Sequence, residues 1–189
     1  MPASVDRIVD GFPHPTINPV LGMPTFATIA DTNLQLNANA ASVHSNLDNG
    51  QLGLLSLTVT LVLYQNLAAT VFISPTNPGP TPIIPTGATG PQIAWLEEEH
   101  TGANRSWKEY LAINKTLKQQ LLGAFDDMYY RCLQNCHTGH AMVTTRYILD
   151  HLYAAYGQLS PQDLTDNDVR IKADYDPLQP IDSLFNQIE

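Results

Sequence analysis

The stretch that most constrains the fold of this chain runs from about Gln92 to Leu133. Its apolar residues recur every three or four positions, which places them on one side of an α-helix. They are Ile93, Leu96, Ala103, Trp107, Tyr110, Leu111, Leu117, Leu121, Phe125, Met128 and Leu133. Most of the residues between them are charged or carry side-chain amides and suit a solvated face. The pattern predicts a mainly α-helical bundle in which the other segments pack on this stripe.

The predicted helix is unusually long. About 42 residues at ~1.5 Å each would make a rod of roughly 60 Å, against an average of about 11–12 residues for helices of globular proteins. Gly102 costs about 1 kcal/mol relative to alanine inside a helix. A break or bend near residues 101–104 is therefore the alternative.

Length and composition narrow the class of protein. The chain has 189 residues, 43% of them hydrophobic, which suffices for one domain with a core and a small piece of another. The longest apolar run, around residues 52–63, is interrupted by glycine, serine and threonine and falls short of the ~20 residues that span a bilayer. The N-terminus has no signal-peptide pattern, and two cysteines make no disulfide framework. We expect a cytoplasmic protein that has no membrane partner.

The distribution of charge argues against a nucleic-acid partner. The net charge is −9, and no lysine or arginine occurs between Arg7 and Arg105. The charged residues inside that interval are all acidic: Asp10, Asp31, Asp48, Glu97, Glu98 and Glu99. Binding to phosphates needs clustered cations, and the cations after Arg105 alternate with carboxylates. We therefore expect no direct nucleic-acid binding by these residues.

The first third of the chain predicts an arm followed by a helix. Residues 1–23 are rich in proline and glycine and indicate an irregular arm. From Pro24, which suits a first helical turn, apolar residues recur at helical spacing as far as Ala41. A turn signal at Asp48-Asn49-Gly50 predicts that this helix ends near residues 45–49.

Short segments of mixed type follow. Residues 55–61 alternate leucine and valine with serine and threonine, which predicts a strand, and residues 71–73 predict a second. Together they would form a small two-stranded β ribbon. Residues 62–69 fit two helical turns capped by Thr60. Residues 75–91 are rich in proline and predict a long exposed loop, a kind that usually binds a partner or is disordered.

The C-terminal part predicts further helices. One runs from about Val143 to Tyr156 and ends at Gly157. Another begins at Ser160-Pro161, with the serine as cap and the proline in the first turn. Residues 181–188 start an amphipathic segment that Glu189 cuts off. Because the chain stops inside this apolar stripe, we expect it to be a fragment of a longer protein.

One cluster has metal-ligand chemistry. It comprises Cys132, Cys136, His137 and His140, and on a continuing helix three of the four would share a face. Two thiolates and two imidazoles would suit tetrahedral zinc. The spacing matches no zinc-finger, ribbon or knuckle pattern, and half-buried cysteines beside a polar helix end explain it more simply. We assign no metal or other cofactor.

Motifs of catalysis are missing from the sequence. It has no glycine-rich phosphate loop, nucleophile elbow or metalloprotease pattern. The runs at 97–99 and 126–127 are better explained as solvated charge than as acid and base pairs. We expect no enzymatic activity, no catalytic residues and no small-molecule substrate.

Four runs together resemble the Gag polyprotein of copia-type LTR retrotransposons. They are 36–47 (LNANAASVHSNL), 117–121 (LKQQL), 144–157 (TTRYILDHLYAAYG) and 175–182 (YDPLQPID). The resemblance implies a capsid protein with a helical N-terminal domain followed by a smaller helical one. After the arm at 1–23, it implies the capsid-like N-terminal domain at 24–157, and at 158–189 a linker helix with the start of the second domain.

The resemblance also implies a function. Such chains self-associate into virus-like particles that enclose the RNA of the element. We expect the contacts to involve the arm, the proline-rich loop and the last helix. Two alternatives remain open at this point: a domesticated Gag-like adaptor that binds a partner protein without assembling particles, and a small metal-dependent enzyme built on the cysteine and histidine cluster.

Overall fold

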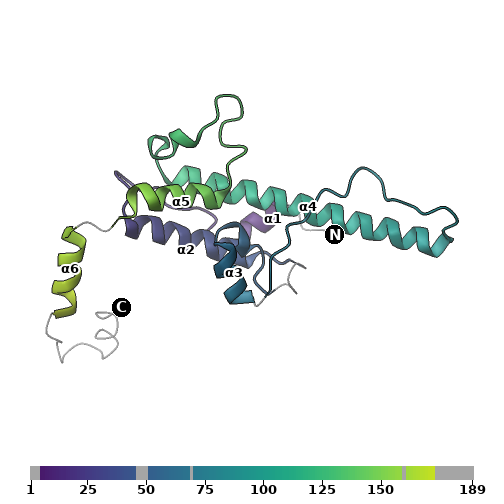
Figure 1. The fold of residues 1–189 in the computed structure, drawn as a ribbon, viewed down its shortest axis with the longest axis horizontal. Helices are drawn as coiled ribbons and strands as arrows, with labels where there is room; N and C mark the ends of the chain where they lie inside the picture. The colour runs from purple at the N-terminus through teal and green to yellow at the C-terminus, as the bar shows by residue number, and fades with distance from the viewer. Residues whose placement is uncertain (1–4, 46–50, 69, 159–160, 173–189) are drawn as a thin grey trace.

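The computed structural model of the chain is mainly helical, and it describes residues 5–45, 51–68, 70–158 and 161–172. Within these described ranges, six α-helices and three short 3-10 helices follow one another (Figure 1). They are α1 (Val5–Asp10), α2 (Phe26–Ser42), η2 (Leu55–Leu57), α3 (Leu61–Ala68), α4 (Gly90–Ala124), η3 (Asp127–Tyr129), η4 (Arg131–Leu133), α5 (Thr145–Tyr156) and α6 (Pro161–Lys172). The prediction of a mainly α bundle around one long helix is confirmed.

Helix α4 is continuous over 35 residues and passes through Gly102 without a break. It starts earlier than predicted, since the Gln92 side chain accepts hydrogen bonds from the backbone N–H and the hydroxyl of Thr89, 2.8 and 3.0 Å away. It also ends earlier. Phe125 is extended at φ −120° and ψ 151°. The prediction that the helix reaches Leu133 is therefore wrong for its last nine positions.

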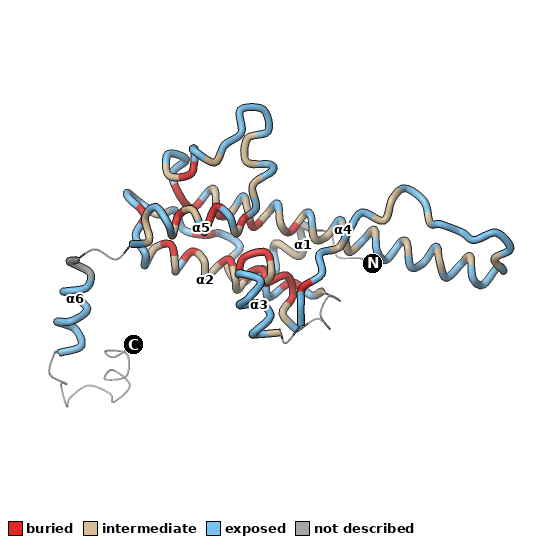
Figure 2. The backbone as a smooth tube through the Cα atoms, viewed as in Figure 1, coloured by how far each residue is buried: buried red, intermediate tan, exposed pale blue. Residues whose placement is uncertain are grey.

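The core lies where α2, α5 and the second half of α4 pack together (Figure 2). Its fully buried apolar side chains on these helices are Ile29, Leu36, Ala40, Ile113, Leu117, Leu121, Ile148, Leu149 and Leu152. The first half of α4 has no buried residue. Figure 1 shows this half projecting beyond the other helices. We call residues 90–110 of α4 the arm helix.

The predicted β ribbon is wrong. In the described ranges the only β pairing is an isolated bridge between Asn135 and Gly139. Leu55, Leu57 and Val59 are buried as the alternation suggests, but Thr58 is buried too, with its hydroxyl donating to Leu55 O at 3.1 Å. The segment is a tight buried turn, so its alternation does not separate an inner face from an outer one. Helix α3 forms as predicted, with Leu63 N donating to Thr60 Oγ1 at 3.2 Å.

The N-terminal residues join the bundle. Val5–Asp10 is helical, whereas residues 11–25 follow the predicted irregular course. Phe12 and Ile17 are buried in the core. Farther along, Thr25 caps α2, so Pro24 precedes the helix instead of lying in its first turn, and α2 ends at Ser42, before the predicted 45–49.

Helices α5 and α6 agree with their predictions. Thr144 caps α5 by accepting from Tyr147 N at 3.1 Å, and Gly157 N closes it on Tyr153 O at 3.0 Å. Helix α6 stands away from the bundle in Figure 1, and residues 164–172 are all exposed. Ser160 and the amphipathic segment at 181–188 lie outside the described residues. The division of the chain at residues 23 and 157 stays a prediction.

Candidate functional site

The cysteine and histidine cluster lies on a looped segment, residues 126–144, because α4 ends before it. Asn135 and Gly139 exchange two backbone hydrogen bonds of 3.0 and 2.9 Å, and Gly139 has a φ of +58°. Asn135 Oδ1 also accepts from His137 N at 2.9 Å. This tight turn replaces the helix on which the zinc interpretation depended.

The four side chains of the cluster do not converge. Cys132 Sγ lies 3.4 Å from Nε2 of His151 on α5, and His140 packs edge-on against Tyr130 with ring centroids 5.2 Å apart. Cys136 and His137 are exposed. Among the residues that the structure describes, no group of three or more His, Cys, Asp or Glu side chains could hold a metal ion. The arrangement gives no support to the metal-dependent enzyme.

The charged and polar groups around this segment serve to hold it in place. Lys118 Nζ donates to the carbonyls of His140 and Ala141 at 3.2 and 3.1 Å, and partial burial lowers the pKa of Lys118. Burial raises the pKa of Tyr130, whose hydroxyl donates to Leu122 O at 2.8 Å. These contacts tie the segment to the end of α4.

An ion pair lies on the surface of the same segment. The guanidinium of Arg131 donates to both carboxylate oxygens of Asp127, at 2.9 and 2.8 Å, and these hydrogen bonds lower the pKa of Asp127. Both side chains are more than half exposed. The pair therefore has the character of solvated charge, as predicted for the acidic run at 126–127.

An exposed apolar surface lies on α3 and the residues that follow it. Tyr64 is the buried residue of this helix, and it packs edge-on against Phe72, with ring centroids 5.4 Å apart. Around this anchor, six large aliphatic side chains are between 45% and 76% exposed. They are Leu61, Val62, Leu63, Leu67, Val71 and Ile73, which we call the α3 surface.

The α3 surface also lacks charge. The sequence has no charged residue between Asp48 and Glu97. Large exposed apolar patches mark interaction sites, and six large aliphatic side chains are exposed on this short stretch. Sequence reasoning missed this surface, because an apolar helix of eight residues is equally compatible with burial in the core and with exposure at the surface.

The proline-rich segment runs back along the arm helix and is held to it by few contacts. Phe72 stacks on Tyr110 with centroids 6.2 Å apart. Farther out, His100 Nε2 lies 3.1 Å from the carbonyl oxygen of Gly79, where the chain turns at a φ of +86°. The predicted long loop is confirmed for residues 75–89, and Pro91 belongs to α4.

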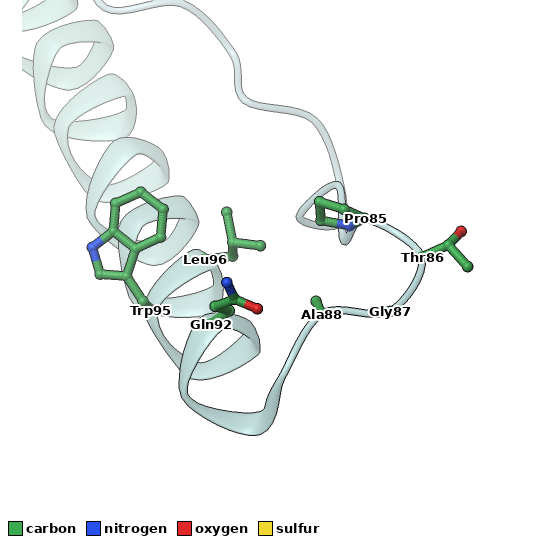
Figure 3. Close-up of a pocket in the computed structure, with 7 residues that line it drawn as sticks. All are labelled: Pro85, Thr86, Gly87, Ala88, Gln92, Trp95 and Leu96. Carbon is green, nitrogen blue, oxygen red and sulfur yellow. The ribbon is translucent and has the colours of Figure 1, made fainter.

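A shallow hollow of about 350 Å³ lies where this segment joins the arm helix. It is lined by Pro85, Thr86, Gly87, Ala88, Gln92, Trp95 and Leu96. Figure 3 shows Gln92 and Leu96 pointing toward the loop, whereas Trp95 projects from the other side of the helix. The lining has no ionisable side chain, and its polar side chains are those of Thr86 and Gln92.

Comparisons with protein families, with curated proteins and with solved structures give no match for this chain. No helix in the described part of the chain is both long and apolar enough to cross a membrane. The features that stand out in the described chain are the exposed side chains of the α3 surface and the projecting arm helix (Figure 1).

Proposed function

We propose that this chain is a structural, non-enzymatic capsid protein of the copia Gag type, which acts in the cytoplasm by self-association into a virus-like particle. The observation that carries the proposal is the α3 surface. Six large aliphatic side chains remain exposed on a short helix anchored by one buried tyrosine. Burying such side chains against a second copy removes apolar area from water at about 25 cal/mol per Å².

Two further features support an assembly role. The sequence resemblance implies a capsid protein. The fold is a helical bundle with a projecting helix, which offers separate faces for separate neighbours. Capsid contacts are individually weak and gain strength by repetition, so the isolated chain is expected to associate only at high concentration.

The test is light scattering and negative-stain microscopy of the chain across concentration. The double variant Leu63→Lys/Leu67→Lys is expected to abolish large assemblies, because it places two charges on the α3 surface. The matched control is Leu21→Lys/Met142→Lys, which adds the same charge at side chains 93% and 82% exposed outside the α3 surface. Circular dichroism shows whether each variant keeps its helix content.

The hollow at the base of the proline-rich loop keeps the adaptor as the second candidate, since its apolar lining would suit a partner segment. An adaptor would bind one foreign protein in a fixed ratio and form no assemblies at any concentration. Wild-type chain that stays monomeric under every condition would contradict the capsid proposal.

A further inference from the structure

The arm helix carries an acidic block and then a basic block, and Glu109 follows the basic one. Glu97, Glu98 and Glu99 form the first, and Arg105 and Lys108 lie in the second. All five residues are exposed. On a solvated helix, acidic residues gain stability from a cation three or four positions further on. The positions that would supply one after the triplet are 100–103 (HTGA), which hold no lysine or arginine.

The two blocks also have no ionic partner elsewhere in the described chain. The ion pairs there join Asp127 with Arg131, Arg146 with Asp150, and Asp168 with Lys172. The blocks are therefore free to meet opposite charge on another molecule.

One face of the arm helix presents one member of each block, Glu98 and Arg105, in line. Positions 91, 95, 98, 102, 105 and 109 are spaced alternately by four and three residues, which places them along one face at about 100° per residue. This face is turned away from Leu96 and His100, which contact the proline-rich segment, and only Trp95 at its edge also lines the hollow there. We call Trp95, Glu98, Gly102 and Arg105 the arm stripe.

The middle of the arm stripe allows close approach. A Cβ atom added at Gly102 would meet no other atom within 4 Å. A second backbone can therefore come nearer at this position than a side chain would permit. Trp95, at one end of the stripe, is 61% exposed and offers a large apolar and aromatic face.

We propose that two copies of this chain pair through the arm stripe in antiparallel orientation, with the two-fold axis near Gly102. In this register Glu98 of each copy faces Arg105 of the other across the axis. Parallel pairing would place glutamates against glutamates, so the charge pattern selects the antiparallel arrangement. The inference rests on the proposed function in that its partner is a second copy, and it names a contact distinct from the α3 surface.

Exposed ion pairs contribute little individually and are screened by salt, with a Debye length of about 8 Å at 0.15 M. The pairing is therefore weak and weakens further as salt is added. Pairing through the arm stripe is measured in the Leu63→Lys/Leu67→Lys background, in which contacts through the α3 surface are removed. Analytical ultracentrifugation gives the dimer dissociation constant.

The decisive experiment mixes two charge reversals. Glu98→Arg alone and Arg105→Glu alone each place like charges opposite one another twice, and each is expected to weaken the dimer about tenfold. An equimolar mixture of the two variants restores both pairs across the axis and is expected to dimerise as the parent does. The control is Asp31→Arg, an equal change of charge at an exposed position on α2, which leaves dimerisation unchanged.

A crosslink tests the register. In a Cys132→Ser/Cys136→Ser background, Gly102→Cys brings two thiols together at the axis, where a disulfide needs Cα atoms less than about 7 Å apart. Rapid formation of a covalent dimer is expected. Ala94→Cys is the control, because antiparallel pairing separates the two copies of that position by roughly 20 Å at 1.5 Å per residue.

The outcomes separate this inference from the proposed function. If the wild type forms particles but no dimer responds to the charge reversals or to their mixture, pairing through the arm stripe is overturned and the capsid proposal is not. A charge-dependent dimer in a wild-type chain that never forms larger assemblies supports the arm pairing and contradicts the capsid proposal. Crosslinking at position 94 as fast as at position 102 overturns the antiparallel register.

Discussion

One buried amide, that of Asn39 on α2, joins the N-terminal residues to two helices. Its Oδ1 accepts from His14 N at 2.8 Å, and its Nδ2 donates to His14 O at 2.7 Å and to Gln120 Oε1 at 3.0 Å. Gln120 in turn donates to Pro15 O at 3.0 Å. Asn39 is fully buried, so each of these bonds forms away from water, where a missing partner costs most.

Asn39→Ala is therefore expected to lower the free energy of unfolding by about 2–3 kcal/mol, because it leaves the His14 backbone groups and Gln120 without their partner. Urea unfolding followed by circular dichroism measures the change. Asn37→Ala is the matched control, since Asn37 Oδ1 is buried without a hydrogen bond and its loss should change stability by less than about 0.5 kcal/mol. Equal stability of the two variants would show that the Asn39 amide contacts do not hold the N-terminal residues around His14 against α2 and α4.

At the scale of elements, α2 is closed by a glycine. Gly53 has a φ of +52°, and a Cβ atom there would lie 2.5 Å from Val43 O and 2.6 Å from Ala41 O. The next residue, Leu54, donates its backbone N–H to Ala40 O at 2.9 Å. The residues after the end of α2 thus return to its last carbonyl groups, and only glycine fits at the point of approach.

Gly53→Ala is expected to cost about 3 kcal/mol or more, from the left-handed backbone and from the contact with two carbonyl oxygens. Gly79→Ala provides the comparison: its φ is +86°, but an added Cβ would meet nothing within 4 Å, so the cost should be about 1–2 kcal/mol. Thermal unfolding of both variants tests the difference. A smaller effect at position 53 than at position 79 would contradict the close approach.

The helices whose caps and periodicity agree were predictable from sequence. Thr144 and Gly157 delimit α5 within two residues of the prediction. The end of α4 was not predictable, because apolar residues keep helical spacing past Ala124 while Phe125 turns inward to a buried site. The zinc interpretation failed for the same reason, since Cys132, Cys136 and His140 would share a face only if the helix continued through them. The α3 surface was not predicted for another reason. The sequence shows which residues are apolar, but it does not show which of them pack against other residues of the chain.

The whole molecule is asymmetric along α4. Ile113, Leu117, Leu121 and Ala124 are buried among α2 and α5, whereas the arm helix has the proline-rich segment beside it and no buried residue (Figure 2). Stability follows buried apolar contact, and regions with few such contacts open locally at low free energy. One continuous helix therefore has two regimes of stability.

Native-state hydrogen exchange should reveal both regimes in the monomer at low concentration. Amides from Ile113 to Ala124 are expected to exchange only through global unfolding, and those of the arm helix through local opening at much lower free energy. Leu117→Ala should lower global stability by about 2–5 kcal/mol, because it opens a cavity in the core. Trp95→Ala should change it by less than about 0.5 kcal/mol, because that side chain is 61% exposed. Uniform protection along the whole of α4 would mean that the arm helix is stabilised by contacts other than those of the described chain.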